Sequence, residues 1–484
     1  MILRNNYIVP TEFGDIYTKK PPLYNWVIIF FYKLLGNYSE WAVRLGSVLS
    51  LLGTAGLVCF LGKRFVDHRF GIISAFFYII VADLLFVFSF LGEIDLFYSF
   101  LTVLSISSIF YFHQRQQYVL LFCFTYFFGA LGTLTKGLPS IPFLGASLLS
   151  FSIYTKEFKR LLSIPHIVGI LIYLLIVGGY LYAYHLQEDL VYYLSGMFGD
   201  ASQRTSGDFP FWEYVQHIFL FPLQTIAGLL PTSLLLIFFS KKALKTNAFI
   251  YFCFLIFSFN IILYWISPGS KQRYIYPLYP FICIVLSYLF YTTEYKKRTK
   301  NLNIFYSYLL ILLGLICFSL PFLTHLDASG LMTAIPLLEV VSITFGVLFI
   351  VLGYLRFKLP AMNTPLFIAG IILVRLIMDL TLIHARNHPS NKHVAERIKT
   401  VELVNITKGA NVFSYGTTIK HRIAFYYSKE SNKIIYGKDK VEDTNTKDFY
   451  IVESKNPALI NKPNNIFLEF MSGSTSMKLI KFLE

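Results

Sequence analysis

Long apolar runs, poor in charge, recur between Trp41 and Ile383, and each approaches the roughly 20 residues that one helix needs to cross a membrane. Backbone groups within hydrocarbon must be satisfied inside their own segment, so these runs predict helices. Hydrophobic residues make up 55% of the chain and charged residues only 14%, unlike a soluble domain. The expected fold class is an α-helical polytopic membrane protein.

Twelve such spans can be placed along the sequence. The ranges are 41–61, 70–90, 96–112, 118–135, 138–154, 163–184, 216–239, 247–266, 274–291, 304–323, 334–355 and 366–384.

Lysines and arginines are concentrated in alternate loops, and short loops rich in them stay on the cytoplasmic side. The intervening loops are poorer in these residues, and the longest, 185–215, contains five acids. We therefore expect residues 1–40 and the tail after 385 to be external. The loops expected inside carry Lys63, Arg64 and Arg69; Arg115; Lys156, Lys159 and Arg160; Lys241, Lys242 and Lys245; Lys296, Lys297, Arg298 and Lys300; Arg356 and Lys358.

The segment 1–40 is expected to be the first external loop. Its apolar stretch from Leu23 to Leu35 is short and follows a Pro pair, which predicts a helix lying at the membrane interface. No signal peptide or first helix precedes this loop, so we hypothesise that Met1 is an internal methionine and that an upstream helix is missing. If the 23–35 helix spans instead, that hypothesis is unnecessary.

The tail, 385–484, differs in character from residues 41–384, which we expect to form the transmembrane catalytic domain. It is rich in charge and contains short alternating runs at Asn411–Tyr415, Arg422–Tyr427 and Phe449–Val452. A helix near Lys392–Val404 comes before these runs. We expect a small soluble α/β domain on the external side.

The net charge of +15 is spread over loops and tail without a basic stripe or an RNA-binding motif, so no nucleic-acid partner is expected. The five cysteines lie singly in apolar runs, and His384 and His388 have no third ligand in the sequence. No P-loop, GxGxxG, GxSxG or HExxH motif stands in a suitable setting. Nucleotide-driven chemistry and serine or zinc hydrolysis are therefore disfavoured.

Charged residues at external helix ends are the candidates for chemistry, because charge near hydrocarbon is costly without a function or a partner. Lys19 and Lys20 precede the Pro pair, where a lysine can bind a lipid phosphate or simply extend its amine to the interface. Glu93 and Asp95 lie at the next external turn. Asp95 is suited to a metal, a sugar hydroxyl or an ammonium, or to capping a helix.

Two further cationic places follow. Lys136 lies at a Gly/Pro break between two apolar helices, and Lys271 and Arg273 begin an aromatic segment marked by Pro277 and Pro280. An arginine fork binds phosphate with two hydrogen bonds. Three cationic places and one acidic place on one face predict a pocket for an anionic lipid head group and an attached polar moiety.

The sequence resembles bacterial C-type (GT-C) glycosyltransferases, the aminoarabinose transferase and protein O-mannosyltransferase relatives. The resemblance covers most of residues 1–290 in order, and four strings carry it. They are Tyr7-Ile8-Val9-Pro10 through Lys20-Pro21-Pro22-Leu23-Tyr24 to Trp41-Ala42-Val43-Arg44-Leu45; Glu93-Ile94-Asp95-Leu96; Leu134-Thr135-Lys136-Gly137; and Lys271-Gln272-Arg273-Tyr274-Ile275-Tyr276-Pro277-Leu278-Tyr279-Pro280.

The resemblance implies a polyprenyl-phosphate sugar as donor and a lipid, glycan or protein as acceptor, at the external face of a bacterial inner membrane. It implies that Lys20 binds the carrier phosphate. By the same resemblance Asp95 matches the family acid of the second external loop, with Glu93 beside it. Candidates to assist in substrate binding are Lys136, Lys271, Arg273, Tyr274 and Tyr24.

Two departures from the family pattern stand out. Relatives carry an acidic pair, typically Asp-Glu, in the first external loop upstream of the position that aligns with Met1, and this chain lacks it. A chain truncated in this way would be inactive. Lys19 stands where some aminoarabinose transferases have an acid, which weakens the case for a divalent metal and for the same donor sugar.

Two other classes fit part of the pattern. A transporter or flippase of lipid-linked saccharides would also need external cations, but it predicts matching broken helices in two halves, and the acids Asp83, Glu339 and Asp379 do not correspond in that way. A ligase of surface polysaccharide shares the donor and differs in the acceptor. The sequence identifies neither the sugar nor the acceptor.

Overall fold

The computed structural model describes residues 1–205, 209–292, 296–323, 335, 337–359, 362–388, 391–438, 445–456 and 463–483. These residues form two compact units. The larger unit comprises residues 7–9 and 18–305, and the smaller comprises 1–6, 10–17 and 306–484. The predicted domain boundaries, 1–40, 41–384 and 385–484, stay a prediction.

The larger unit is helical. Its elements are α1 (Leu23–Leu35), α2 (Glu40–Phe65), α3 (His68–Ile79), η2 (Asp83–Val87), η3 (Phe88–Phe90), α4 (Ile94–His113), α5 (Tyr118–Lys136), α6 (Ser140–Thr155), η4 (Phe158–Leu162), α7 (Ile164–His185), α8 (Leu190–Thr205), α9 (Phe211–Gly228), η5 (Thr232–Phe238), α10 (Lys241–Leu244), α11 (Ala248–Trp265), η6 (Gln272–Leu278) and α12 (Tyr279–Tyr291).

Side-chain caps set several helix starts in this unit. The side chains of Ser39, Asp67 and Asn247 accept hydrogen bonds from backbone N–H groups in the first turns of α2, α3 and α11. These N–H groups have no partner within the helix, so a cap removes the cost of leaving them unpaired. Short polar residues between apolar runs therefore fix where neighbouring helices begin.

Nine of the described helices are long and apolar enough to cross a membrane, and the fold class predicted from the sequence is confirmed. Two further predicted spans are bent: α3 meets η2–η3 at 57°, and α9 meets η5 at 106°. Counting each bent pair as one span gives eleven. The remaining predicted span, 138–154, forms α6, which is apolar but only 16 residues long.

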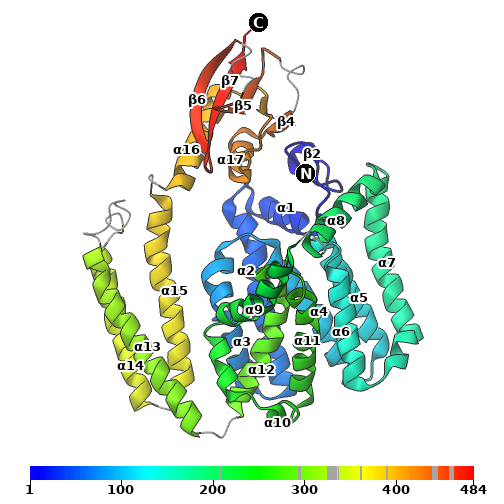
Figure 1. The fold of residues 1–484 in the computed structure, drawn as a ribbon, viewed down its shortest axis with the longest axis vertical. Coiled ribbons are helices and arrows are strands. Elements are labelled where there is room, and N and C mark those ends of the chain that lie inside the picture. The colour runs from blue at the N-terminus through cyan, green and yellow to red at the C-terminus, as the bar shows by residue number, and fades with distance from the viewer. Residues whose placement is uncertain are drawn as a thin grey trace. The chain divides into compact units, whose positions relative to one another are not determined.

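The centre of the larger unit is the η6–α12 segment, whose hydrophobic side chains are almost all buried. Helices α3 and α11 pack on α12 within this unit (Figure 1). Gly62 and Gly71 bring α2 and α3 close together, since a Cβ on Gly71 would lie 2.5 Å from the Cys59 carbonyl oxygen. Burial of α12 fixes the segment that carries Lys271 and Arg273.

The smaller unit contains long helices followed by a mixed sheet. Its elements are η1 (Ile2–Arg4), β1 (Thr11–Glu12), β2 (Asp15–Ile16), α13 (Lys296–Leu323), which begins in the larger unit, α14 (Leu338–Lys358), α15 (Asn363–Asn387), α16 (Lys392–Thr407), β3 (Val412–Tyr415), α17 (His421–Ser431), β4 (Tyr436–Lys438), β5 (Phe449–Glu453), β6 (Asn464–Ser472) and β7 (Thr475–Phe482).

The sheet has the strand order β4-β3-β5-β7-β6. Strand β3 pairs in parallel with β4 and β5, and β7 pairs antiparallel with β5 and β6. Leu403 of α16 and Tyr427 of α17 are buried in one core with residues of the sheet. The predicted α/β character of the tail is therefore confirmed.

A hairpin from the N-terminal region packs on this C-terminal domain. Strands β1 and β2 pair through Thr11 with Ile16, and Phe13 contacts the domain core. The Phe13 carbonyl accepts a hydrogen bond from the Gly437 amide at 2.9 Å, and the Phe13 ring stacks on His421 with 5.6 Å between centroids. Residues 10–17 are thus part of the same unit as the tail.

Two sequence interpretations need correction. The alternating run Arg422–Tyr427 is not a strand but lies within helix α17, where Ile423, Tyr426 and Tyr427 are buried at helical spacing. The loop 185–215 is not simply a loop, because it contains helix α8. Its buried Tyr193 stacks on Tyr184 with ring centroids 4.3 Å apart.

Candidate active site

The centre of the site is an ion pair between Asp95 and Lys136. Asp95 lies in the first turn of α4, and Lys136 is the last residue of α5. Lys136 Nζ donates to Asp95 Oδ1 at 2.6 Å, and the two side chains are only 5% and 3% exposed. Asp95 therefore does not cap its helix; it holds a cation from the neighbouring one.

Arg273 extends this pair into a cluster. Its Nη1 donates to Glu93 Oε2 at 2.7 Å, and its Nε lies 4.0 Å from Asp95 Oδ2. The side chains of Arg273 and Glu93 are each about one-third exposed, whereas Asp95 and Lys136 are buried. The cluster therefore has a buried half formed by Asp95 and Lys136, and an open half formed by Glu93 and Arg273.

Lys20 belongs to the same cluster. The charges that stabilise the Asp95 carboxylate are those of Lys136, Arg273 and Lys20. The next residue, Pro21, packs on Gly137, since a Cβ added to Gly137 would lie 3.6 Å from Pro21 Cδ. The lysine-proline loop and the end of α5 thus meet, although more than 100 residues separate them in the chain.

Aromatic side chains surround the buried lysine. Lys136 Nζ lies 4.9 Å from the ring centroid of Tyr98 and 4.8 Å from that of Tyr274. A cation over an aromatic face is stabilised by the ring's quadrupole. Tyr274, predicted to bind substrate, therefore contacts the lysine and contributes to its placement.

Tyr24, the other predicted aromatic residue, is buried on α1. Its hydroxyl is 2.7 Å from Ser47 Oγ, which donates to the Glu93 carbonyl at 2.7 Å. Burial raises the pKa of Tyr24, and its hydrogen bond with Ser47 opposes that rise. Tyr24 therefore remains a neutral phenol that ties α1 to α2 and, through Ser47, to the turn carrying Glu93.

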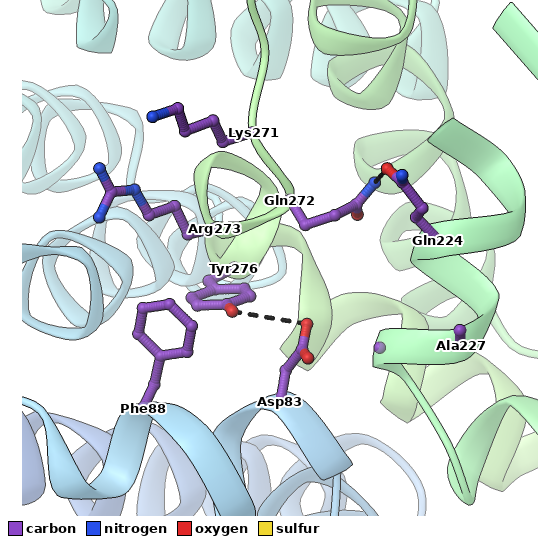
Figure 2. A pocket seen from close by; sticks show the side chains of 9 residues that line it. Asp83, Phe88, Gln224, Ala227, Lys271, Gln272, Arg273 and Tyr276 are labelled. Carbon is purple, nitrogen blue, oxygen red and sulfur yellow. Dashed lines mark hydrogen bonds between the residues drawn. The ribbon is translucent and has the colours of Figure 1, made fainter. Parts of the chain in front are cut away.

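A cavity of about 510 Å³ opens beside Arg273. Figure 2 shows that Lys271 and Arg273 extend to one side of it, whereas Gln272 points toward Gln224 of α9 on the other. Asp83 points to Tyr276, which donates to Asp83 Oδ2 at 3.4 Å. The volume lies within the range of roughly 300–1,000 Å³ that is typical of small-molecule pockets.

All eight predicted site residues therefore lie in the larger unit, and the structure brings Lys20, Asp95, Lys136 and Arg273 together. Sequence reasoning did not place two features of the site. Helix α8 was missed, and its Gly196 and Met197 contact Thr18 and Gly137. Asp83 was noticed as an intramembrane acid, but only the fold shows that it lines a cavity. Whether these side chains act on a substrate stays a prediction.

The part of the chain that the structure describes contains no cluster of side chains suited to hold a metal ion. Among those residues, His, Cys, Asp and Glu do not gather in groups of three or more that could hold an ion. Asp95 and Glu93, the acids nearest the cluster's centre, are both bonded to cationic side chains. The site therefore holds its charge balance through lysine and arginine.

Comparison with known proteins concerns the family and the fold. Residues 19–182 match the model of the family described as dolichyl-phosphate-mannose-protein mannosyltransferase. An uncharacterized protein of Aquifex aeolicus (strain VF5) is 26% identical over 332 residues, which span 66% of this chain and 63% of that relative. The matched region thus covers less than two-thirds of the relative's length.

Two solved structures share the fold over 99% of this chain and 90% of their own. They are ArnT from Cupriavidus metallidurans bound to undecaprenyl phosphate, with a TM-score of 0.72, and the same protein in the apo state, with a TM-score of 0.70. Both are 14% identical to this chain. The predicted fold is thereby confirmed, and the family resemblance read from the sequence is supported by the family match over residues 19–182.

Proposed function

We propose that this membrane protein is a GT-C glycosyltransferase, which moves one sugar from a polyprenyl-phosphate carrier to an acceptor hydroxyl, amine or phosphate. The observation that carries the proposal is the cluster of Lys20, Lys136 and Arg273 around Asp95 and Glu93. A solved structure of the same fold, ArnT from Cupriavidus metallidurans, is bound to undecaprenyl phosphate. That lipid phosphate is the chemistry that such a cluster would hold.

The balance of charge supports a phosphate ligand. Lys20, Lys136 and Arg273 surround the two carboxylates Glu93 and Asp95. The cavity beside them adds Lys271 and Asp83, so the site keeps an excess of one positive charge. A sugar phosphodiester carries one negative charge, and the departing polyprenyl phosphate develops a second. Fixed cations stabilise the charge that grows as the bond to the sugar breaks, and this lowers the barrier.

The proposed step is a displacement at the anomeric carbon. An acceptor oxygen or nitrogen forms the new bond, the bond from the anomeric carbon to the phosphate oxygen breaks, and the acceptor proton passes to a base. Glu93 is the better placed of the two acids, because it is partly exposed and only its Oε2 is bonded to Arg273 within the described residues. Asp95, bonded to the buried Lys136, positions the cations.

The side of the membrane and the acceptor also belong to the proposal. The distribution of lysine and arginine favours the external face of a bacterial inner membrane. A lipid, a glycan or a protein can each supply the nucleophile. The activity of the chain, its donor sugar and its acceptor are all part of this proposal.

The test is a pair of measurements on purified full-length protein in detergent: binding of undecaprenyl phosphate and turnover of polyprenyl-phosphate sugars. Lys20→Ala should weaken carrier binding and lower kcat/KM by roughly 10²-fold, the cost of removing one preorganised electrostatic contact. Lys19→Ala is the matched control, since Lys19 is the exposed neighbour of the same charge. Asp95→Asn should lower turnover by disturbing Lys136.

The comparison of the two lysines decides the assignment. Equal losses for Lys19→Ala and Lys20→Ala would mean that general surface charge, not a specific site, attracts the carrier. Full turnover in both Lys20→Ala and Asp95→Asn would overturn the site. Carrier binding without any sugar transfer by the wild type, across donors and acceptors, would favour a transporter of lipid-linked saccharides.

A further inference from the structure

The cavity beside Arg273 contains an acid that the proposed phosphate chemistry does not use. Asp83 lies in η2, at the bend between α3 and η3, and its carboxylate lines the cavity. Two tyrosine hydroxyls donate to it, Tyr276 at 3.4 Å and Tyr279 at 3.2 Å. Both hydrogen bonds found for Asp83 within the described residues end on Oδ2, so Oδ1 is available to a ligand.

The opposite helix is shaped to leave room for this acid. A Cβ added to Gly228 of α9 would lie 2.4 Å from Asp83 Oδ2, so only glycine lets the carboxylate stay where it is. The neighbouring Ala227, also at the cavity wall, is small as well. Space next to a carboxylate at membrane depth is costly unless water or a polar ligand fills it.

The cavity has two chemically different ends. Lys271 and Arg273 supply positive charge at one, and Asp83 and Gln224 supply a carboxylate and an amide at the other. Gln224 Oε1 accepts from Gln272 Nε2 at 3.3 Å, and the Gln224 NH₂ takes part in none of the hydrogen bonds found among the described residues. A phosphate suits the first end, and a group with hydrogen-bond donors and acceptors suits the second.

An aromatic wall joins these ends. Phe88 meets Tyr276 edge to face, with 4.7 Å between ring centroids, and both line the cavity. Aromatic walls with a few placed polar groups are typical of small-molecule pockets, where the apolar surface packs on the ligand and the polar groups orient it. A sugar ring presents both kinds of surface.

We infer that this cavity binds the sugar of the donor, with its phosphate at Arg273 and a hydroxyl or amino group of the ring donating to Asp83. The inference rests on the proposed function and adds the sugar subsite to it. Asp83 is here a specificity residue: it selects sugars that place a hydrogen-bond donor at that position. Arg273, which contacts Glu93 and also lines the cavity, connects sugar binding to the phosphate cluster.

The experiment compares carriers with and without a sugar. Full-length wild type, Asp83→Asn and Asp83→Leu are titrated with bare undecaprenyl phosphate and with the same lipid bearing mannose, arabinose or an amino sugar. We expect Asp83→Leu to bind its best sugar-bearing carrier at least tenfold more weakly, with bare-carrier affinity within twofold of the wild type. If an amine is the group recognised, Asp83→Asn should lose the amino-sugar carrier most.

A second variant tests the cavity without removing the charge. Ala227→Leu should fill the space beside Asp83 and weaken only the sugar-bearing carrier. Ile226→Phe is the control for added bulk, because Ile226 is exposed on the same helix and does not line the cavity. Equal effects of Ala227→Leu and Ile226→Phe would contradict the assignment of the sugar to this cavity.

The outcomes separate the two proposals. Wild type that binds the bare carrier but gains nothing from any sugar overturns the sugar subsite and leaves the phosphate site standing. Equal weakening of bare and sugar-bearing carriers in Asp83→Leu also overturns it, since Asp83 would then only support the fold at the bend. Wild type that binds neither carrier overturns the proposed function and, with it, the subsite.

Discussion

Removing the amine of Lys136 should destabilise the protein through the charge it leaves behind. At 2.6 Å from Asp95, with an effective dielectric constant of about 20, the lost attraction is roughly 6 kcal/mol. Breaking a buried pair typically costs about 3–5 kcal/mol net, because the remaining ion stays desolvated. Arg273 Nε remains 4.0 Å from Asp95, so we expect Lys136→Met to cost about 3 kcal/mol, the lower end of that range.

The measurement is the free energy of unfolding of the full chain, titrated with denaturing detergent in mixed micelles. The double variant Lys136→Met/Asp95→Leu removes both charges, and apolar replacement of a whole buried pair is often neutral. It should therefore recover most of the loss while transfer activity stays low. Arg44→Met is the control, since the Arg44–Glu40 pair on α2 is exposed and should contribute less than about 1 kcal/mol.

Two results would refute the reasoning about stability, and a third would refute the link to activity. A loss below about 1 kcal/mol in Lys136→Met would mean that the pair is hydrated like a surface pair. A double variant less stable than the single variant would mean that Asp95 contributes through contacts other than Lys136. Recovery of both stability and activity in the double variant would remove this ion pair from the proposed chemistry.

Three further predictions concern packing, the hairpin and topology. Gly71→Ala should cost about 1–3 kcal/mol, because the added methyl group would clash with the α2 backbone, whereas Gly56→Ala, with open space around it, should be neutral or slightly stabilising in the same unfolding titration. Phe13→Ala should speed hydrogen exchange of the amides in 10–17, since its ring packs on the C-terminal domain; unchanged exchange would exclude that role. Cysteines replacing Asp15 and Lys408, which are exposed residues of the same unit, should react with an impermeant reagent from the same side of sealed vesicles, and labelling from opposite sides would contradict the docking of the hairpin.

Most helices were predictable because membrane insertion is decided locally. A run of apolar residues must be helical wherever it lies in hydrocarbon, and the predicted ranges agree with α2, α4, α5, α7 and α11 to within a few residues. The bend after α3 was not predictable. Composition stays apolar through Ile80 and Val81, where α3 ends, so hydropathy contains no signal for the 57° change of direction.

The site was predictable as a set of residues but not as a network. A charged side chain at a helix end stands out in an apolar chain, and this identified Lys20, Asp95, Lys136 and Arg273. Their pairing depends on contacts between residues far apart in sequence, such as Glu93 with Arg273, which no local pattern encodes. Asp83 was visible too, but its surroundings come from three separate segments.

The packing of β1–β2 on the C-terminal domain also restricts how many times the chain crosses the bilayer. Because residues 10–17 and the sheet belong to one unit, an even number of crossings must separate them. Eleven candidate spans among the described helices leave one crossing to be found. The two shorter apolar helices, α1 and α6, are the candidates, and α6 is the longer of them. The 16 residues of α6 at 1.5 Å each reach about 24 Å, short of a hydrocarbon thickness of about 30 Å.

A spanning helix this short requires the bilayer to thin around it, and α6 begins four residues after Lys136. Lipid head groups would then lie deeper there than elsewhere, at the level of the phosphate that we propose this lysine helps to bind.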